Sequence, residues 1–196
     1  MTSAVLRILS RNTSVTELTI DIDVVKFASV AFEDLLTRTQ TLQKLEIIAY
    51  DDAAFDERQT AAIASGFANN TTLCDLELDS WGEADLGPVL TALQHHPVLK
   101  KIHFNALSFD YLPSLSGLEV LLRSQDSKVK QLIFEDIDAR TVGLHPVMQE
   151  LERNTRVTSL TIRNSKLNHD SVQQLRAVLR QNTALQHLTL HLSRLR

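Results

Sequence analysis

The sequence predicts an α/β fold in which short parallel strands alternate with helices along one continuous array. Three observations predict it: an apolar triplet recurs seven times, helical apolar spacing fills the intervals, and an Asn-Thr pair recurs just before several triplets. Each triplet reads apolar-x-x-apolar-x-apolar, and successive copies start 27, 31, 26, 30, 28 and 28 residues apart. A steady period near this length is typical of a solenoid, whose repeats bury their apolar faces against one another.

The triplets predict about seven short strands. In chain order the copies are Val15/Leu18/Ile20, Leu42/Leu45/Ile47, Leu73/Leu76/Leu78, Leu99/Ile102/Phe104, Val129/Leu132/Phe134, Val157/Leu160/Ile162 and Leu185/Leu188/Leu190. Parallel strands need crossover connections, and the intervening helices supply them. Strands lie about 4.8 Å apart whereas helices are about 10 Å wide, so the array must curve. The expected shape is a horseshoe, with a concave parallel sheet and helices on the convex side.

Helices are expected in the intervals, where apolar residues recur every three or four positions. The residues that share a helical face are Val5, Leu6, Ile8 and Leu9; Phe32, Leu35 and Leu36; Leu86, Val89, Leu90 and Leu93; Leu144, Val147, Met148 and Leu151; and Val172, Leu175, Val178 and Leu179. Asp170 and Ser171 predict the start of the last helix. Before Val129 the spacing of Leu121, Leu122 and Asp126 departs from the rule, which predicts a one-residue irregularity.

An asparagine followed by threonine stands three residues before four of the strands. These asparagines are Asn12, Asn70, Asn154 and Asn182. Asparagine tolerates the left-handed backbone that often follows a helix, so we interpret the four as helix stops rather than as ligand-binding residues. Thr39, His96 and Asp126 hold the equivalent place in other repeats.

Composition excludes several classes of function. The net charge of −4 argues against nucleic acid and against an acidic membrane surface as partners. The single cysteine, Cys74, excludes an intrachain disulfide and favours a reducing, cytoplasmic location. Arg7 interrupts the first apolar run, so the start of the chain predicts neither a signal peptide nor a membrane span.

The sequence predicts no enzyme active site, no cofactor and no metal. It has five glycines, and they form neither a phosphate-binding loop nor a dinucleotide-binding motif. It also lacks the C-x-x-C and H-E-x-x-H patterns of common metal sites. His187 and His191 would face the same way along a strand, but about 13 Å apart, which is too far to share a metal ion.

The expected binding surface is the concave side of the sheet. Successive side chains of a strand point to opposite faces, so the third, fifth and seventh residues of each repeat face this side if the apolar positions face the core. The candidate partner-binding residues there are Glu46, Glu77, Asp79, His103, Ile133 and Arg163. The first three predict a mildly acidic patch over the second and third repeats, suited to a basic protein partner. The alternative is an ordinary solvated face.

Other positions on the surface carry secondary expectations. Ile48 and Ile133 are expected to be exposed, either as apolar anchors for a partner or as isolated surface aliphatics. Glu17, Lys44, Asp75 and Lys101 alternate in sign, which predicts a self-neutralising ladder. A loop with Asp51, Asp52, Asp56 and Glu57 is a rim where binding specificity can reside. Trp81, in the next loop, is expected either to be buried as a wedge under that loop or to be a hot spot at the edge of a binding surface.

The stretches VTSLTIRNSKL (157–167) and LQHLTLHLSRL (185–195) resemble leucine-rich repeats of the ribonuclease-inhibitor-like class. This resemblance extends over nearly the whole chain. It implies one leucine-rich repeat domain over residues 1–196, with about seven repeats, acting as a non-enzymatic protein-interaction module. The alternatives that it implies are a GTPase-activating protein of the Ran type and an actin-binding, tropomodulin-like domain. GTP hydrolysis and actin elongation assays distinguish the three.

The repeat array is expected to be incomplete at both ends. It opens with a helix that no strand precedes and closes with a strand, 185–190, that no helix follows. Such an edge strand offers unpaired backbone groups to another chain. The sequence therefore predicts either a piece of a longer repeat protein or self-association at the C-terminal edge strand.

Overall fold

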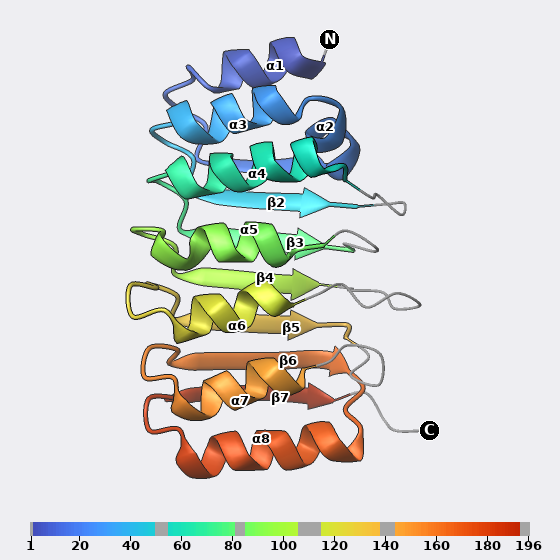
Figure 1. Ribbon diagram of the computed structural model, residues 1–196, viewed down its shortest axis with the longest axis vertical. Coiled ribbons are helices and arrows are strands. Elements are labelled where there is room, and N and C mark those ends of the chain that lie inside the picture. Colours follow the sequence, from blue (N-terminus) through green and yellow to red (C-terminus); the bar gives the residue numbers. More distant parts are fainter. Residues whose placement is uncertain (1, 50–54, 81–84, 106–114, 138–143, 193–196) are drawn as a thin grey trace.

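The computed structural model describes residues 2–49, 55–80, 85–105, 115–137 and 144–192. Within these ranges the seven strands form a single sheet in the order β1-β2-β3-β4-β5-β6-β7, and every neighbouring pair is parallel. The order in space is therefore the order in the chain, and each turn of the backbone lies on the one before it (Figure 1). The predicted α/β class and all seven parallel strands are confirmed.

The strands are short and evenly distributed. They are β1 (Glu17–Asp21), β2 (Lys44–Ile48), β3 (Asp75–Asp79), β4 (Lys101–Asn105), β5 (Gln131–Glu135), β6 (Ser159–Ser165) and β7 (His187–Leu192). The helices are α1 (Thr2–Leu9), α2 (Ile22–Phe27), α3 (Ser29–Arg38), α4 (Glu57–Asn69), α5 (Gly87–Ala92), α6 (Ser116–Arg123), α7 (His145–Arg153) and α8 (His169–Gln181). A single 3-10 turn, η1 (Leu93–His95), continues α5. The short helix α2, directly after β1, was not predicted.

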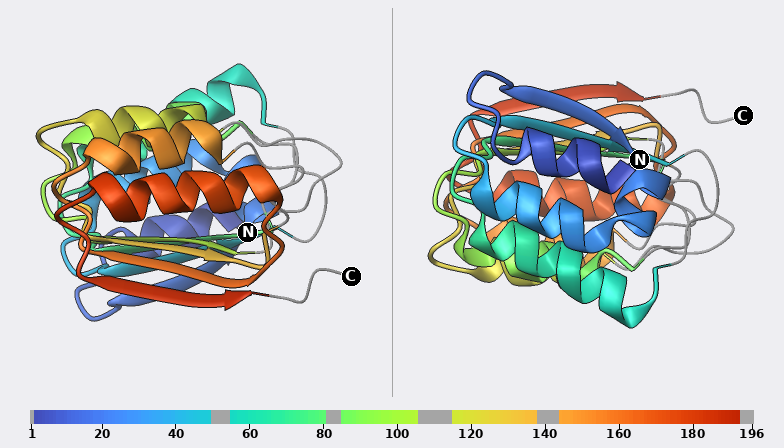
Figure 2. Two further views of the ribbon diagram at one scale, coloured as in Figure 1. Left: turned by 90° about the horizontal axis from the view of Figure 1, so that it is seen from below. Right: turned by 90° about the horizontal axis from the view of Figure 1, so that it is seen from above.

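All the helices cover one face of the sheet, and the other face is open (Figures 1 and 2). Burial along the strands explains this arrangement: in β2, β3 and β4 the residues alternate between half-buried and fully buried. In these three strands the buried positions are the second and third members of the triplets, as predicted. The third, fifth and seventh residues of each repeat therefore lie on the uncovered face, which we call the open face.

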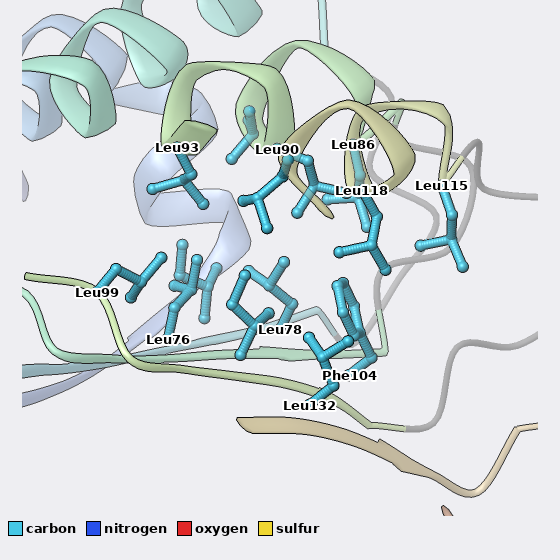
Figure 3. Packing of buried hydrophobic residues seen from close by; sticks show 14 of the residues in the cluster. Leu76, Leu78, Leu86, Leu90, Leu93, Leu99, Phe104, Leu115, Leu118 and Leu132 are labelled. Atoms are coloured by element: carbon cyan, nitrogen blue, oxygen red, sulfur yellow. The ribbon is translucent and has the colours of Figure 1, made fainter. Parts of the chain in front are cut away.

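The core fills the space between the helices and the sheet. Leu76, Leu78 and Phe104 from the strands meet Leu90 and Leu118 from the helices (Figure 3). The aromatic members pack in order along the array, because triplets in register place equivalent side chains next to each other. Phe104 and Phe134, for example, stack with ring centroids 5.4 Å apart and an interplanar angle of 10°. One continuous aliphatic and aromatic layer thus joins all the repeats.

The recurring asparagines end their helices as predicted, but the predicted left-handed backbone is wrong. Asn70, Asn154 and Asn182 have φ values of −73°, −70° and −72°, in the extended region. Their side chains explain why asparagine is used. The Asn154 Oδ1 accepts from the backbone N–H groups of Arg156 and Val157, at 2.8 Å each, and its Nδ2 donates to the Leu122 carbonyl of the preceding repeat at 2.7 Å. Asn70, Asn154 and Asn182 therefore each close their own turn and fasten it to the previous one.

Left-handed residues do occur, at the opposite end of the strands. Among the described non-glycine residues, Ser80, Asp136 and Asn164 have φ values of 55°, 53° and 51°. All three follow the seventh residue of a repeat, and two backbone N–H groups there, of Ser80 and Asp136, donate to a carbonyl of the next strand. The left-handed backbone thus turns the chain out of the sheet while keeping it paired.

Two further details correct the predicted boundaries. The helix α8 starts earlier than Asp170, because Asn168 is its N-cap and accepts from the Ser171 N–H at 2.8 Å. In the fifth repeat, α6 ends at Arg123, and its C-cap, Ser124, lies two residues before Asp126. Asp126 is exposed and pairs with His95 at 3.0 Å, so it does not take the asparagine's place. The irregularity predicted there is present, and it is larger than one residue.

His96 replaces the asparagine in the fourth turn. Its Nδ1 accepts from the Leu99 N–H at 3.1 Å, which leaves the proton on Nε2, 3.3 Å from the Asn70 Oδ1. The ring is buried, and burial lowers the pKa of His96 from 6.5 to about 4. Protonation would remove the Nδ1 acceptor and place a charge in the core, so the neutral ring is the form that stabilises the fold.

Stability should therefore fall on acidification through His96. The unfolded chain binds a proton near pH 6.5 and the folded chain only near pH 4, so the contribution is complete above pH 6.5 and is lost towards pH 4. The slope from this one group approaches about 1.4 kcal/mol per pH unit in that interval. Urea unfolding gives the free energy of unfolding of the wild type and of His96→Asn at each pH. The difference between these two free energies should change between pH 6.5 and pH 4. A difference that stays constant over this interval would contradict the prediction.

Candidate interaction surface

The open face is built from three rows of side chains that run across the strands in register. The third-position row is Glu17, Lys44, Asp75, Lys101, Gln131, Ser159 and His187; the fifth-position row is Thr19, Glu46, Glu77, His103, Ile133, Thr161 and Thr189; the seventh-position row is Asp21, Ile48, Asp79, Asn105, Glu135, Arg163 and His191. The stacking of equal repeats thus gathers residues that are 26 to 31 positions apart in the chain.

Carboxylates dominate the part of the open face formed by β1, β2 and β3. The acidic residues in its rows are Glu17, Asp21, Glu46, Asp75, Glu77 and Asp79, and the single basic residue is Lys44. Glu46 and Glu77 are register partners on neighbouring strands. Two like charges about 5 Å apart repel by just under ~1 kcal/mol in water. We call this surface the acidic patch, and its potential favours a cation placed over it.

The two central glutamates differ in their surroundings. The Thr19 hydroxyl donates to the Glu46 Oε2 at 2.9 Å and fixes that carboxylate towards β1. The Glu77 Oε1 lies 3.1 Å from the His103 Nδ1, and both of these side chains are largely covered by their neighbours. Glu46 is therefore the more available of the two for a partner, while Glu77 is held at the border with β4.

His103 stands between two carboxylates. Its Nε2 is 3.3 Å from the Glu135 Oε2, close enough for an ion pair although the direction is outside that of a hydrogen bond. The same Glu135 oxygen lies 3.9 Å from the Arg163 Nη1. Glu77, His103, Glu135 and Arg163 thus form a chain of contacts across four strands. An imidazolium ring can donate to both carboxylates, whereas a neutral ring has a single N–H.

The third-position row is partly self-neutralised, as the sequence predicts. The Lys101 ammonium lies 2.8 Å from the Asp75 Oδ2. The second carboxylate oxygen, Asp75 Oδ1, is buried without a hydrogen-bond donor from the residues that the structure describes, and so is Asn105 Oδ1 in the seventh-position row. Both are acceptors, so they add to the negative potential at the border of the acidic patch.

The structure places the six candidate residues on the open face, but it does not bring all of them together. Glu46, Glu77 and Asp79 lie side by side on β2 and β3, as predicted. His103 and Arg163 belong to the chain of contacts instead. The expected exposure of Ile133 is wrong: it is only 4% exposed, between its register partners His103 of β4 and Thr161 of β6. Ile48 is half-buried, so neither isoleucine is a freely exposed anchor.

Glu135 is the residue that sequence reasoning missed. It connects His103 to Arg163 and so determines where the acidic patch ends. The signal was present in the repeat phase, because Glu135 is the seventh residue of its repeat and is therefore aligned with Arg163 in the next. Only the pairing of rows across strands, rather than the residue types, identifies it.

A second concave region lies away from the sheet, where α6 and α7 end. This groove of about 340 Å³ contains three arginines, Arg123, Arg153 and Arg156. The Glu150 carboxylate accepts from the Arg123 Nη2 at 2.6 Å, and this hydrogen bond together with its charge raises the pKa of Arg123. The Arg156 Nη2 donates to Gln125 at 2.7 Å. Two of the three guanidinium groups are thus already used to join neighbouring repeats.

In the described ranges, no three histidine, cysteine, aspartate or glutamate side chains are placed to hold a metal ion. None of the described helices has both the length and the apolar character needed to cross a bilayer. Asp51, Asp52 and Trp81 of the predicted rim loops lie outside the described residues, whereas Asp56 caps α4 and accepts from the Gln59 N–H.

No protein-family model matches this chain, and no curated protein matches it in sequence.

Proposed function

We propose that this chain is a leucine-rich repeat solenoid of the ribonuclease-inhibitor-like class and acts as a non-enzymatic protein–protein interaction module. On this proposal the array is bowed, because helices about 10 Å wide are stacked beside strands about 4.8 Å apart, and the open face is its concave side. Strands in sequence order with helices on one face support the proposal. We place the module in the cytoplasm, which the single Cys74 favours.

The observation that carries the functional part is the acidic patch. Six carboxylates and one lysine lie in register over β1, β2 and β3, none of the described helices covers them, and of the six only Asp75 pairs with a lysine of the next strand. Surface carboxylates usually alternate with cations, as Asp75 does with Lys101. Concentrated charge of one sign instead accelerates and orients the approach of an oppositely charged partner. The partner that fits is an extended, basic segment of a protein.

The repeat geometry also determines how such a segment would bind. Lysine or arginine side chains spaced to reach Glu46 and Asp79 would lie across the strands and replace the repulsion between these carboxylates by attraction. Each exposed ion pair contributes little, roughly 0.2–1 kcal/mol, so affinity requires several contacts at once. The rows of equal spacing on a solenoid provide them.

Charge reversal in the acidic patch should weaken the binding of a basic peptide by about tenfold or more, which corresponds to about 1.4 kcal/mol. The probe is a fluorescein-labelled decapeptide of alternating lysine and serine, and the measurement is fluorescence anisotropy at low and at physiological salt. The test variant is Glu46→Lys/Glu77→Lys. The matched control, Glu57→Lys/Glu152→Lys, makes the same change in net charge on the helix side of the molecule.

The outcomes separate the proposal from nonspecific attraction. The wild type and the control should bind the peptide alike, with affinity that decreases as salt increases. Equal weakening by both double variants would mean that net charge alone attracts the peptide. Equal affinity of the wild type and the Glu46→Lys/Glu77→Lys variant would remove the acidic patch as the binding surface.

A further inference from the structure

The C-terminal end of the array exposes apolar side chains that are buried in every interior repeat. Leu188 and Leu190 of β7 are 37% and 38% exposed, whereas their equivalents in β6, Leu160 and Ile162, are fully buried. On the helix layer, Leu179 of α8 is 50% exposed, and its equivalent in α7 is buried. This end therefore presents one complete cross-section of the core, from helix to strand.

The N-terminal end presents the matching cross-section. Among the described helices α1 packs against α3, and its other side faces away from the array (Figure 1). On α1, Val5 and Ile8 are exposed, Ile8 to 70%. The strand below it, β1, pairs with β2 along one edge only. The unit α1–β1 has the same order, helix then strand, as the last unit, α8–β7.

The backbone at the two ends is complementary as donor and acceptor. Within the array, two consecutive N–H groups at the start of each strand donate to one carbonyl of the preceding repeat. Gln43 and Lys44 bond Thr16 in this way, at 2.7 and 3.0 Å, and Gln186 and His187 bond Thr158, at 2.9 Å each. The equivalent carbonyl at the C-terminal end is that of Gln186. The equivalent donors at the N-terminal end are the N–H groups of Thr16 and Glu17.

The asparagine turns show the same complementarity. The Nδ2 of Asn182 donates to the carbonyl of Leu151 at 2.6 Å, in the helix of the preceding repeat. At the N-terminal end, Asn12 adopts the same turn, because its Oδ1 accepts from the Ser14 and Val15 N–H groups at 2.8 and 2.7 Å. Among the described residues no acceptor faces its Nδ2. The matching carbonyl at the other end belongs to Leu179.

Charges at the two ends are also complementary. If the register of the sheet continued from β7 to a following β1, His187 would lie beside Glu17 and His191 beside Asp21, with Thr189 beside Thr19 between them. The histidine–carboxylate pairs repeat a contact that joins interior strands, where His103 contacts Glu77, and the threonine pair repeats the register of Thr161 and Thr189.

From these observations we infer that the chain stacks head to tail on a second copy of itself, with β7 of one copy parallel to β1 of the next and α8 against α1. The two cross-sections lie at opposite extremes of the molecule, so one copy cannot bring its own ends together (Figure 1). A contact between two different surfaces does not close on itself after one step. The assembly is therefore a stack that grows with concentration, open unless the rotation between successive copies closes it into a ring, and it forms independently of any partner on the open face.

The test uses two exposed positions, one at each end. Leu179→Arg places a charge on the C-terminal cross-section and Ile8→Arg on the N-terminal one. Because both side chains are at least half exposed, both variants should keep the wild-type thermal unfolding midpoint, measured by circular dichroism. Val30→Arg is the matched control, since Val30 is an exposed apolar residue of α3, which lies between α1 and α4. His187→Glu provides a second block of the C-terminal end.

Sedimentation equilibrium over a concentration series gives a distinct result for each possibility. The wild type and Val30→Arg should rise above the monomer mass of 22.0 kDa with concentration, while Leu179→Arg and Ile8→Arg each stay at that mass. An equimolar mixture of these two variants should form a one-to-one pair and nothing larger, because one intact end of each kind remains. A wild type that stays monomeric would overturn the inference. So would Ile8→Arg that still dimerises alone, which would indicate pairing of two C-terminal edges.

Discussion

Replacing Asn70 by alanine should reduce the free energy of unfolding by about 3–5 kcal/mol. Asn70 is fully buried and connects three parts of the molecule. Its Nδ2 donates to the Leu36 carbonyl at 2.6 Å, and its Oδ1 accepts from the backbone N–H groups of Thr72 and Leu73 at 3.0 and 2.8 Å. Alanine leaves these groups without their partner. Each buried group left without a hydrogen bond costs about 1–3 kcal/mol, a large share of the 5–15 kcal/mol that stabilises a typical protein.

The effect should extend beyond one turn, because Asn70 also contacts the next repeat. The His96 Nε2 lies 3.3 Å from the same Oδ1, so the fourth turn loses its acceptor when Asn70 is removed. In a solenoid each repeat is stabilised mainly by its neighbours, and an interior defect weakens two interfaces. Urea unfolding should therefore show a lower midpoint for Asn70→Ala.

The adjacent asparagine provides the control. Asn69 is exposed, and its Nδ2 donates within its own helix, to the Ser65 carbonyl at 2.9 Å. Asn69→Ala should change the stability by less than about 0.5 kcal/mol, the usual range for surface positions. If the two substitutions lowered the urea midpoint equally, the stabilising role assigned to the buried turn would be wrong.

The strands could be predicted from the sequence because two apolar residues in each are required to face the core. Leu45 and Ile47 of β2 face the core in this way, and so do Leu76 and Leu78 of β3, independently of the residues around them. The positions of the asparagine turns followed from the same phase. Their backbone conformation did not, because asparagine was interpreted through its tolerance of φ > 0, whereas the side-chain hydrogen bonds to the previous repeat are the reason for its presence.

The sequence predicted which residues lie on the open face, but not which of them contact one another. The repeat phase correctly placed Glu46 beside Glu77. Whether a side chain on that face is free depends on the residues to either side of it on neighbouring strands, some 26 to 31 positions away in the chain. Ile133 is buried for this reason, and Glu135 joins His103 to Arg163 for the same reason. Predicting such contacts requires the register of every strand pair.

The apolar pattern also could not predict that two of the helices approach each other closely. Gly117 lies in α6 and faces the start of α5. A Cβ atom added to Gly117 would collide with the carbonyl oxygen of Gly87 and would lie 2.7 Å from the Leu90 Cβ. Neither obstacle can move easily, since one is backbone and the other is the first atom of a buried side chain. The absence of a side chain at this position therefore determines how closely α5 and α6 pack.

Substituting Gly117 with alanine should accordingly destabilise the protein by about 2–3 kcal/mol. Overpacking of a close-packed interior typically costs about 1–3 kcal/mol, and the collision with backbone places this case at the upper end. Alanine gains about 1 kcal/mol over glycine in helix propensity, so the measured loss will be smaller than the steric penalty alone. Thermal unfolding followed by circular dichroism should show this loss of stability as a lower unfolding midpoint, because the alanine side chain forces α5 and α6 apart.

Gly66 allows the steric and the conformational effects of the same substitution to be separated. It is also a buried glycine inside a helix, α4, but a Cβ there would lie 3.1 Å from the Glu33 Cα and from the Leu36 Cδ1, contacts that a shift of a few tenths of an ångström relieves. The gain in helix propensity is the same at both sites, so Gly66→Ala should be within about 1 kcal/mol of the wild type. A similar loss at the two glycines would show that the narrow α5–α6 contact is not what Gly117 provides. A loss confined to Gly117→Ala would mean that the missing side chain at this position is what allows α5 and α6 to pack closely.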